Sequence, residues 1–185
     1  MRLFVAVNLD AATRAAIQRA IDTFPLPDPP WRWSGPSTWH ITLKFIGETP
    51  PGDRERIIAA LAPVARGHAA FDLALGALGG FPSLRAPRVL FYSVASGAGA
   101  CSTLAHDIDA ALGDALAVER EARHFHAHAT VARIQHRVTA DVTAALTRVP
   151  AIAVPALRVT GFELMESRLG RGGAVYSVVA RFPLA

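Results

Sequence analysis

The chain has 185 residues, of which 51% are hydrophobic, and it carries a formal net charge of +4 at pH 7. This length fits one domain with a sizeable core, and the high apolar content excludes global disorder. A basic chain favours an anionic partner such as nucleic acid. The alternative source of the charge is an Ala/Arg-rich composition, since Lys44 is the only lysine.

The cysteine count and the apolar runs limit the cellular context. Cys101 is the only cysteine, which excludes an internal disulfide and a zinc site built from several cysteines. The N-terminal apolar run is interrupted by Asn8 and Asp10 and makes a poor signal peptide. No apolar stretch reaches the length that a bilayer requires. We therefore expect a cytoplasmic protein with no membrane partner.

The predicted elements alternate between helices and strands along the whole chain. Asp10 is a suitable N-cap, Ile17 and Ile21 have the spacing of a buried helical stripe, and the proline-rich 24–30 ends this helix. In chain order, the pattern predicts a strand over 2–9, a helix over 10–23, a loop over 31–39, a strand over 39–47, a helix over 53–65, strands over 71–78 and 88–94, a helix over 102–116, a strand over 126–133, a helix over 138–149, and strands over 156–167 and 174–182.

The two halves of the chain repeat the order helix, strand, helix, strand, strand. This is an internal repeat of architecture and not of detailed sequence. No low-complexity linker separates the halves. We therefore expect an α+β fold and a single domain over 1–185, in which two pseudo-symmetric lobes of mainly antiparallel sheet pack together with helices outside. We expect a monomer.

The first strand of each repeat carries the pattern His-x-Thr. These residues are His40 and Thr42 in one strand, and His128 and Thr130 in the other. Side chains at positions i and i+2 of a strand point the same way, so each strand presents an imidazole beside a hydroxyl. If a pseudo-two-fold axis relates the lobes, the two pairs face each other across a cleft.

Such a set of side chains suits chemistry at a phosphate. One neutral histidine can take a proton from water while the other, protonated, gives a proton to the leaving oxygen. The hydroxyls can hold non-bridging oxygens, and no metal ion is needed. Arg133 adds a positive charge five residues after His128. Because this offset is odd, Arg133 reaches the same face only if the strand contains a bulge.

The segments "HITLKF" and "HATVAR" resemble the paired signature of the 2H phosphoesterases, and within them the bacterial and archaeal RNA 2′,3′-cyclic phosphodiesterases, also called 2′-5′ RNA ligases. "RLFVAV", "RW", "FPSLRAPRVLF" and "FELMESRL…VYSVVARF" resemble the same family in the same order. The resemblance implies a bilobal fold with a central V-shaped cleft. Two apolar departures are Ala127, where members often have proline, and Val131, where they have leucine.

The same resemblance implies an activity and roles for residues. The activity is metal-independent and cofactor-free hydrolysis of RNA 2′,3′-cyclic phosphodiester ends to 2′-phosphomonoesters, with reversible 2′-5′ ligation as a further capacity. His40 would be the general acid that expels the 3′ oxygen and His128 the general base, while Thr42, Thr130 and Arg133 would bind the phosphate. The implied partner is RNA with a cyclic phosphate end, tRNA fragments being one candidate.

Two other functions remain open at this point. One is a non-catalytic RNA-binding module, although such a module would hold phosphate better with arginine than with histidine. The other is a phosphoesterase that acts on a small cyclic nucleotide. A metal site at the alternating His124, His126 and His128 is a weaker alternative, because no acidic or cysteine partner is near in sequence.

Further residues are candidates for contact with RNA. Aromatic side chains near the first motif would stack on unpaired bases, or belong to the core: Trp31, Trp33, Trp39 and Phe45. Arginines in predicted loops would grip the RNA backbone, or form an ordinary solvated surface: Arg32, Arg85, Arg88, Arg168 and Arg171.

Overall fold

The computed structural model describes residues 1–23, 31–116, 120–134, 144–149, 151–152, 155–170 and 173–185. Its helices are α1 (Ala11–Asp22), α2 (Arg54–Arg66) and α3 (Ala98–Leu116), with short 3-10 helices η1 (Pro36–Thr38) and η2 (Pro51–Asp53). Its strands are β1 (Arg2–Asn8), β2 (Trp31–Trp33), β3 (His40–Glu48), β4 (Phe71–Phe81), β5 (Val89–Ser96), β6 (His128–Ile134), β7 (Leu157–Val159), β8 (Gly161–Gly170) and β9 (Gly173–Pro183).

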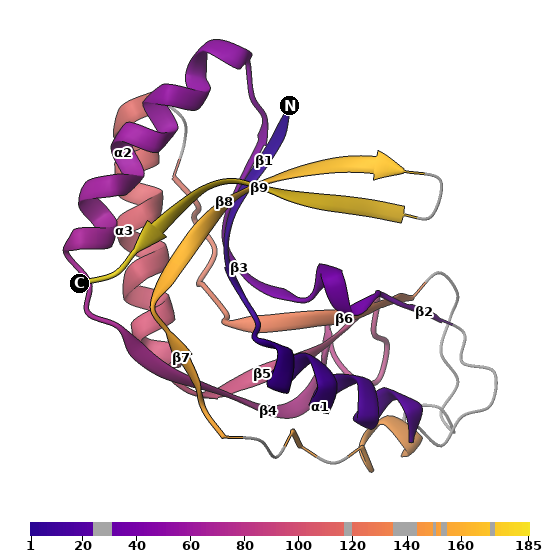
Figure 1. The fold of residues 1–185 in the computed structure, drawn as a ribbon. Helices are drawn as coiled ribbons and strands as arrows, with labels where there is room; N and C mark the ends of the chain where they lie inside the picture. Colours follow the sequence, from indigo (N-terminus) through magenta and orange to yellow (C-terminus); the bar gives the residue numbers. More distant parts are fainter. Residues whose placement is uncertain (24–30, 117–119, 135–143, 150, 153–154, 171–172) are drawn as a thin grey trace.

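These strands form one antiparallel sheet. Its order is β7-β4-β5-β6-β3-β1-β8-β9, and β2 pairs with β6 beside this path. The sheet curls into an open half-barrel, with the β8–β9 hairpin on one arm and β4, β5 and β6 on the other (Figure 1). The predicted α+β class is confirmed, and the two motif strands, β3 and β6, lie at the centre of the sheet.

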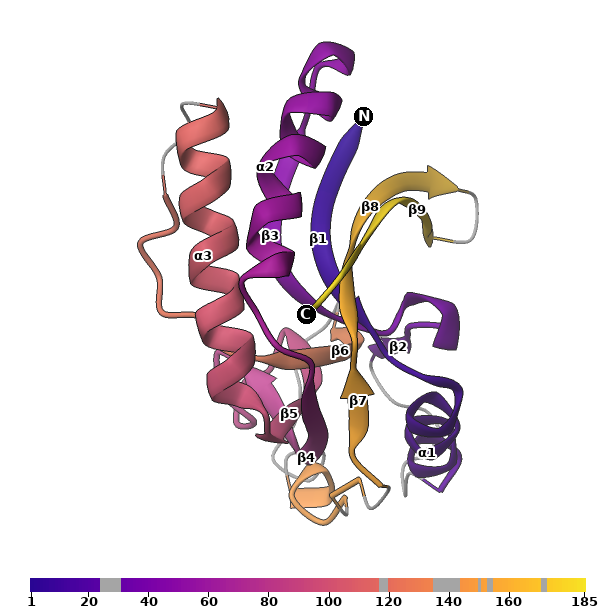
Figure 2. The same cartoon turned by 60° about the vertical axis from the view of Figure 1, so that its left-hand side comes forward.

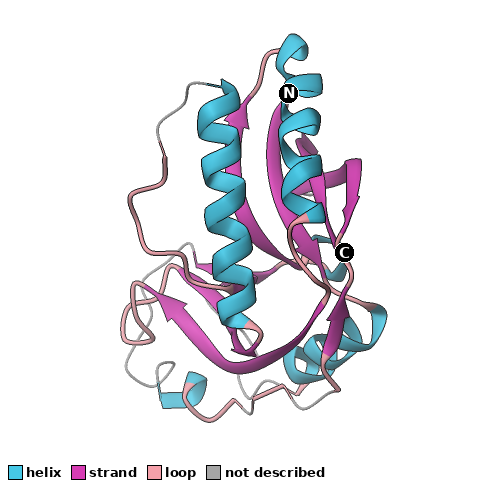
Figure 3. Ribbon diagram, turned by 90° about the vertical axis from the view of Figure 1, so that its left-hand side faces the viewer, coloured by secondary structure: helices cyan, strands magenta, loops and turns pink. Residues whose placement is uncertain are grey.

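Two long helices cover one side of this sheet. Helices α2 and α3 pack side by side, and α1 lies away from them (Figures 2 and 3). Ile57 and Leu61 of α2, like Leu104 and Ile108 of α3, are fully buried at the i, i+4 spacing of an apolar stripe. No helix in the described ranges is both long enough and apolar enough to cross a lipid bilayer.

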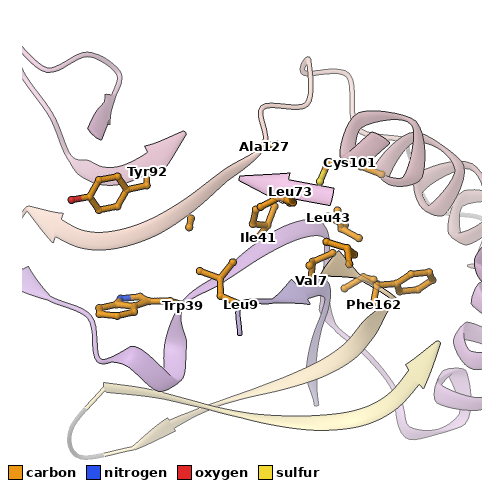
Figure 4. Packing of buried hydrophobic residues seen from close by; sticks show 14 of the residues in the cluster. Val7, Leu9, Trp39, Ile41, Leu43, Leu73, Tyr92, Cys101, Ala127 and Phe162 are labelled. Carbon is orange, nitrogen blue, oxygen red and sulfur yellow. The ribbon is translucent and has the colours of Figure 1, made fainter. Parts of the chain in front are cut away.

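The core between helices and sheet draws on both halves of the chain. Ile41 and Leu43 of β3 lie in it with Leu73 of β4 and Cys101 of α3 (Figure 4). At the start of α1, the Asp10 side chain accepts a hydrogen bond of 2.7 Å from the Thr13 backbone, which confirms the predicted N-cap.

The strands of the two halves are exchanged in the sheet. The β4–β5 hairpin comes from the first half of the chain but pairs with β6, and the β8–β9 hairpin from the second half pairs with β1, the neighbour of β3. From the centre outward, one arm runs β3, β1, β8, β9 and the other runs β6, β5, β4, β7. The repeat that is visible in sequence becomes two similar arms, each with strands from both halves.

The structure differs from the sequence-based elements in two places. The strand predicted over 156–167 is divided at Thr160, and its two parts, β7 and β8, pair with β4 and β1 on opposite arms. The loop predicted over 31–39 contains β2 and η1, because this segment pairs with β6. The proline-rich 24–30 and most of the helix predicted over 138–149 lie outside the described residues, and 144–146 are helical.

The turn from β5 into α3 depends on glycine, which gives a test of this architecture. Gly97 has φ +80°, and a Cβ there would overlap the Asp72 carbonyl oxygen. We expect Gly97→Ala to destabilise the protein by about 1–3 kcal/mol, measured by urea unfolding. Gly99→Ala is the matched control, since nothing lies within 4 Å of its Cβ position. Equal stability of Gly97→Ala and the parent protein would contradict this reading of the turn.

Candidate active site

A single residue pair joins the two motif strands. Ile41 of β3 is opposite Ala129 of β6, and both side chains are fully buried. Because side chains alternate along a strand, the residues on either side of this pair point to the opposite face. That face, which we call the motif face, carries His40 and Thr42 from β3, and His128 and Thr130 from β6, all partly buried. The structure therefore brings the four predicted His-x-Thr residues together.

The antiparallel direction gives this face a local two-fold symmetry. It places His40 towards Thr130, and Thr42 towards His128, across the Ile41–Ala129 pair. Each imidazole therefore has one hydroxyl on its own strand and another across the pair. In His40, Nε2 is 3.0 Å from Oγ1 of Thr42.

His40 is held in its neutral form. Burial lowers its pKa to about 4, because the charged imidazolium loses its hydration. A hydrogen bond with the Thr38 backbone acts in the opposite direction, while the positive charges of Arg14 and His128 lower the pKa further.

His128 is oriented by the backbone two residues before it. Its Nδ1 is 2.7 Å from the His126 carbonyl oxygen, which can only accept a hydrogen bond. Nδ1 therefore carries the proton in the neutral ring, and Nε2 has a free lone pair. Burial lowers the pKa of His128, and the nearby His126 lowers it further, so this neutral form dominates at pH 7. The Thr38 contact of His40 has the same two-residue offset.

Each histidine also packs against two aromatic rings, which sequence reasoning missed. The His40 ring centroid is 4.9 Å from that of Phe4 on β1 and 5.3 Å from that of Tyr176 on β9. Strand β1 pairs with β3, whereas β9 lies two strands beyond β1 at the edge of the sheet, so both rings meet His40 only in the folded sheet. No local sequence signal assigns them to this histidine.

The second histidine has an equivalent pair of rings. Its centroid is 5.0 Å from Phe81 on β4 and 5.1 Å from Phe91 on β5, and those two phenylalanines stack at 4.3 Å. Glycine at position 79 leaves room for this arrangement, since a Cβ there would lie 2.6 Å from the Phe91 ring. These apolar walls exclude water from around the imidazoles and so account for their lowered pKa values.

A bulge in β6 turns Arg133 onto the motif face. On the neighbouring β5, Phe91 is opposite Thr130, but the next residue back, Leu90, is opposite Ala132, so Val131 is the extra residue. Val131 and Ala132 are consecutive and both fully buried. Two successive side chains on the same side of a strand are expected at a bulge. Arg133 consequently points to the same side as Thr130 and is exposed. The bulge expected from its odd offset is confirmed.

A matching bulge lies in β3 at the same offset from its histidine. On β1, Ala6 is opposite Thr42 and Val5 is opposite Lys44, so Leu43 is the extra residue. Lys44 points to the helix side, where it forms an ion pair with Asp109 of α3. The next residue, Phe45, therefore lies on the motif face, where it is 65% exposed and its ring is 5.9 Å from Phe4.

The remaining RNA-contact candidates differ in their burial and in their ion pairs. Trp39 is fully buried and Trp31 is 7% exposed, so neither offers a ring for base stacking, whereas Trp33 is half-buried and packs against the core. Arg168 forms an ion pair with Glu166 at 2.9 Å. Among the arginines considered for RNA contact, those without an ion pair to any described carboxylate are Arg32, Arg85, Arg88 and Arg133, and Arg171 lies outside the described residues.

No group of three or more His, Cys, Asp or Glu suited to a metal ion is found among the described residues. His124 and His126 are both exposed, and the rings of His126 and His128 are 5.9 Å apart. A hollow of about 510 Å³ lies beside Asn8 and Glu163 on β1 and β8, and its lining contains none of the four motif residues.

Comparison with known proteins gives matches along the whole chain. A family model described as LigT like phosphoesterase matches residues 7–91. A Thermus thermophilus protein named RNA 2′,3′-cyclic phosphodiesterase is 33% identical, covering 100% of this chain and 90% of its own length. A protein of the same name from Geobacillus stearothermophilus is also 33% identical over 98% of this chain, which spans only 56% of that longer protein.

A solved structure agrees with these sequence matches. The crystal structure of E. coli LigT complexed with 3′-AMP has a TM-score of 0.81 and 25% sequence identity, covering 99% of this chain and 97% of that one. The resemblance noted from the two His-x-Thr motifs is thereby confirmed. The protein belongs to the LigT-like phosphoesterases, the family of its relatives named RNA 2′,3′-cyclic phosphodiesterase.

Proposed function

We propose that this protein hydrolyses the 2′,3′-cyclic phosphodiester ends of RNA to 2′-phosphomonoesters, with two histidines as acid and base and without a metal ion. The observation that carries the proposal is the Ile41–Ala129 pair, which sets both imidazoles and both threonine hydroxyls on one face. The names of the relatives support the substrate class, and the 3′-AMP bound to E. coli LigT supports a nucleotide ligand.

The reaction transfers two protons and exchanges one bond at phosphorus. His128, through the free lone pair of Nε2, takes a proton from a water molecule as the water oxygen bonds to phosphorus. The bond from phosphorus to the 3′ oxygen breaks, and His40 gives that oxygen its proton. The products are a 3′ hydroxyl and a 2′-phosphate, and the two histidines have exchanged protonation states.

The hydroxyls and the arginine hold the phosphate during this exchange. Thr42 and Thr130 lie beside the two histidines, where their hydroxyls donate hydrogen bonds to the non-bridging oxygens. Arg133 offers a fixed charge and several donors from the end of the same face. Because these donors are already placed before the substrate arrives, little reorganisation is needed in the transition state.

The low pKa of His40 in the free protein constrains the acid step. With a pKa of about 4, His40 is mostly neutral at pH 7 and cannot donate a proton efficiently. A bound phosphodiester brings a negative charge next to the ring, which favours the imidazolium and raises its pKa. Substrate binding therefore favours protonation of His40, which stays mostly neutral in the free protein.

The same site can join RNA ends. If a 5′ hydroxyl replaces water as the nucleophile, opening the cyclic phosphate yields a 2′-5′ phosphodiester by the same proton transfers. We expect a monomer that acts on RNA ends, tRNA fragments among them. A small cyclic nucleotide would fit the same chemistry, and the preference between the two is open to measurement.

Replacement of either histidine tests the proposed roles. We expect His40→Ala and His128→Ala each to lower kcat for a cyclic-phosphate-ended oligonucleotide by about 10²–10⁴-fold, because each removes one proton transfer. His106→Ala is the matched control, since this histidine is exposed on α3. Thermal unfolding should show that all three variants remain folded. Turnover at the parent rate in both site variants would exclude the paired mechanism, and binding without turnover in the parent protein would favour a binding module.

The lowered pKa values predict the pH dependence. The productive free enzyme has His40 protonated and His128 neutral, and both pKa values lie below 6.5. We expect kcat/KM to follow a bell whose maximum lies below pH 6.5 and which falls as the pH rises. Bound phosphate raises both pKa values, so the bell for kcat should lie at higher pH. Steady-state rates across pH 4–9 would measure both profiles, and coincident bells would contradict protonation of His40 on substrate binding.

The position of the product phosphate tests the assignment of acid and base. With His40 protonating the 3′ oxygen, the product of a cyclic-phosphate-ended oligonucleotide carries a 2′-phosphate. Phosphorus NMR, or resistance of the product to a 3′-specific phosphatase, would identify it. A 3′-phosphate would keep the site but reverse the substrate within it, and His128 would then face the leaving oxygen.

A further inference from the structure

Strand β2 places a second arginine beside Arg133. In the β2–β6 pairing, Arg32 lies directly opposite Arg133, and both side chains are exposed. Directly opposed residues of an antiparallel pair point to the same side of the sheet. Because the β6 bulge turns Arg133 onto the motif face, Arg32 is on that face too.

Two like charges in this position oppose folding. Like charges directly opposite each other destabilise an antiparallel pair. In the described part of the chain, neither Arg32 nor Arg133 has a carboxylate within 4.0 Å, although other exposed arginines do, such as Arg168 with Glu166 and Arg158 with Asp72. The pair is therefore a local concentration of positive charge that an anion would neutralise.

The backbone around Arg32 is tightly fixed. Its neighbours Trp31 and Trp33 pack on the core side, so the arginine side chain is left to the other face. Immediately after them, the backbone N–H and the hydroxyl of Ser34 donate hydrogen bonds of 2.8 and 2.9 Å to the carbonyl oxygen of Val131, the bulge residue. The indole N–H of Trp39 donates to the same serine hydroxyl at 3.0 Å. One segment thus supports the β6 bulge and positions Arg32.

The arginine pair lies beyond the reacting phosphate along the sheet. Ala129, at the centre of the motif face, is opposite Tyr92, while Arg133 is opposite Val89 on the same strand. Three strand residues correspond to about 10 Å. Arg133 can reach back towards the phosphate between the histidines, and a second guanidinium on the same group would meet the repulsion of the first. The neighbouring phosphate of an RNA strand is one ribose unit away.

We propose that Arg32 binds the phosphodiester immediately 5′ of the cyclic phosphate, while Arg133 faces the reacting group. This rests on the proposed function and extends it to substrate choice. Each guanidinium then binds its own anion, so the two arginines together hold two successive phosphates. A nucleoside 2′,3′-cyclic monophosphate lacks the second phosphate, so Arg32 makes the site selective for oligonucleotide ends.

The test compares two substrates in matched variants. The substrates are a short oligonucleotide with a 2′,3′-cyclic phosphate end and the corresponding nucleoside 2′,3′-cyclic monophosphate. The measured quantity is the preference, defined as the ratio of their kcat/KM values. We expect Arg32→Gln to lower the preference about tenfold or more, because a charged hydrogen bond is lost with the oligonucleotide alone. The salt dependence of oligonucleotide binding should weaken by about one counterion.

Arg66→Gln is the matched control for this change. Arg66 is the exposed last residue of α2, which packs on the core side of the sheet, away from the motif face. The control removes the same charge far from the site, and we expect it to leave the preference unchanged. Arg32→Lys keeps the charge and should restore part of the preference. Thermal unfolding of all three variants checks that the sheet is intact.

An unchanged preference in Arg32→Gln overturns the proposal, whether both substrates lose rate equally or neither does. An equal loss from Arg66→Gln also overturns it, since general charge would then explain the effect. Failure of the proposed function looks different, because the parent protein would turn over neither substrate. In that case the test measures binding instead of turnover, with an oligonucleotide and a nucleoside that each carry a 2′-phosphate. If Arg32→Gln weakens the affinity for both ligands equally, the role of Arg32 is rejected.

Discussion

The pairing of Ile41 with Ala129 is the contact on which the site depends. It is a small contact, but both residues are fully buried, so the core fixes which way each strand faces. A slip by one residue in either strand would turn its histidine and threonine inwards and bring Ile41 or Ala129 out. Burying an imidazole and a hydroxyl without partners costs more than the slip could return. The same pairing therefore fixes both the hydrophobic core and the motif face.

The two arms are alike in geometry and different in chemistry. Each motif strand has a bulge three residues after its histidine, and each bulge turns the residue at the fifth position onto the same face. That residue is Phe45 in one strand and Arg133 in the other. A two-fold scaffold thus presents an apolar ring at one end and a guanidinium at the other. This difference suits a substrate whose ends differ, such as a nucleotide with its base and its phosphate.

Most elements and the four motif residues are predictable from sequence because they depend on short-range periodicity. The alternation of side chains is enough to put His40 beside Thr42, and a bulge is expected once Arg133 is placed on the face of His128, because its offset is odd. The pairing partners are not predictable in this way. Phe4 meets His40 through the pairing of β1 with β3, and Tyr176 meets it only through the exchange of strands between the halves. β2 has three residues, too few for a periodic signal, and the division at Thr160 follows from pairing on two different arms.

The exchange of hairpins has a consequence for protein synthesis. Both motif strands exist once β6 has emerged from the ribosome, but β8 and β9 follow it in the chain. Until they arrive, β1 has an open edge and His40 lacks the wall that Tyr176 supplies. A nascent chain with both motifs therefore still lacks part of the surroundings of His40. The assembly of this face therefore waits for the β8–β9 hairpin, although both of its motif strands are synthesised earlier.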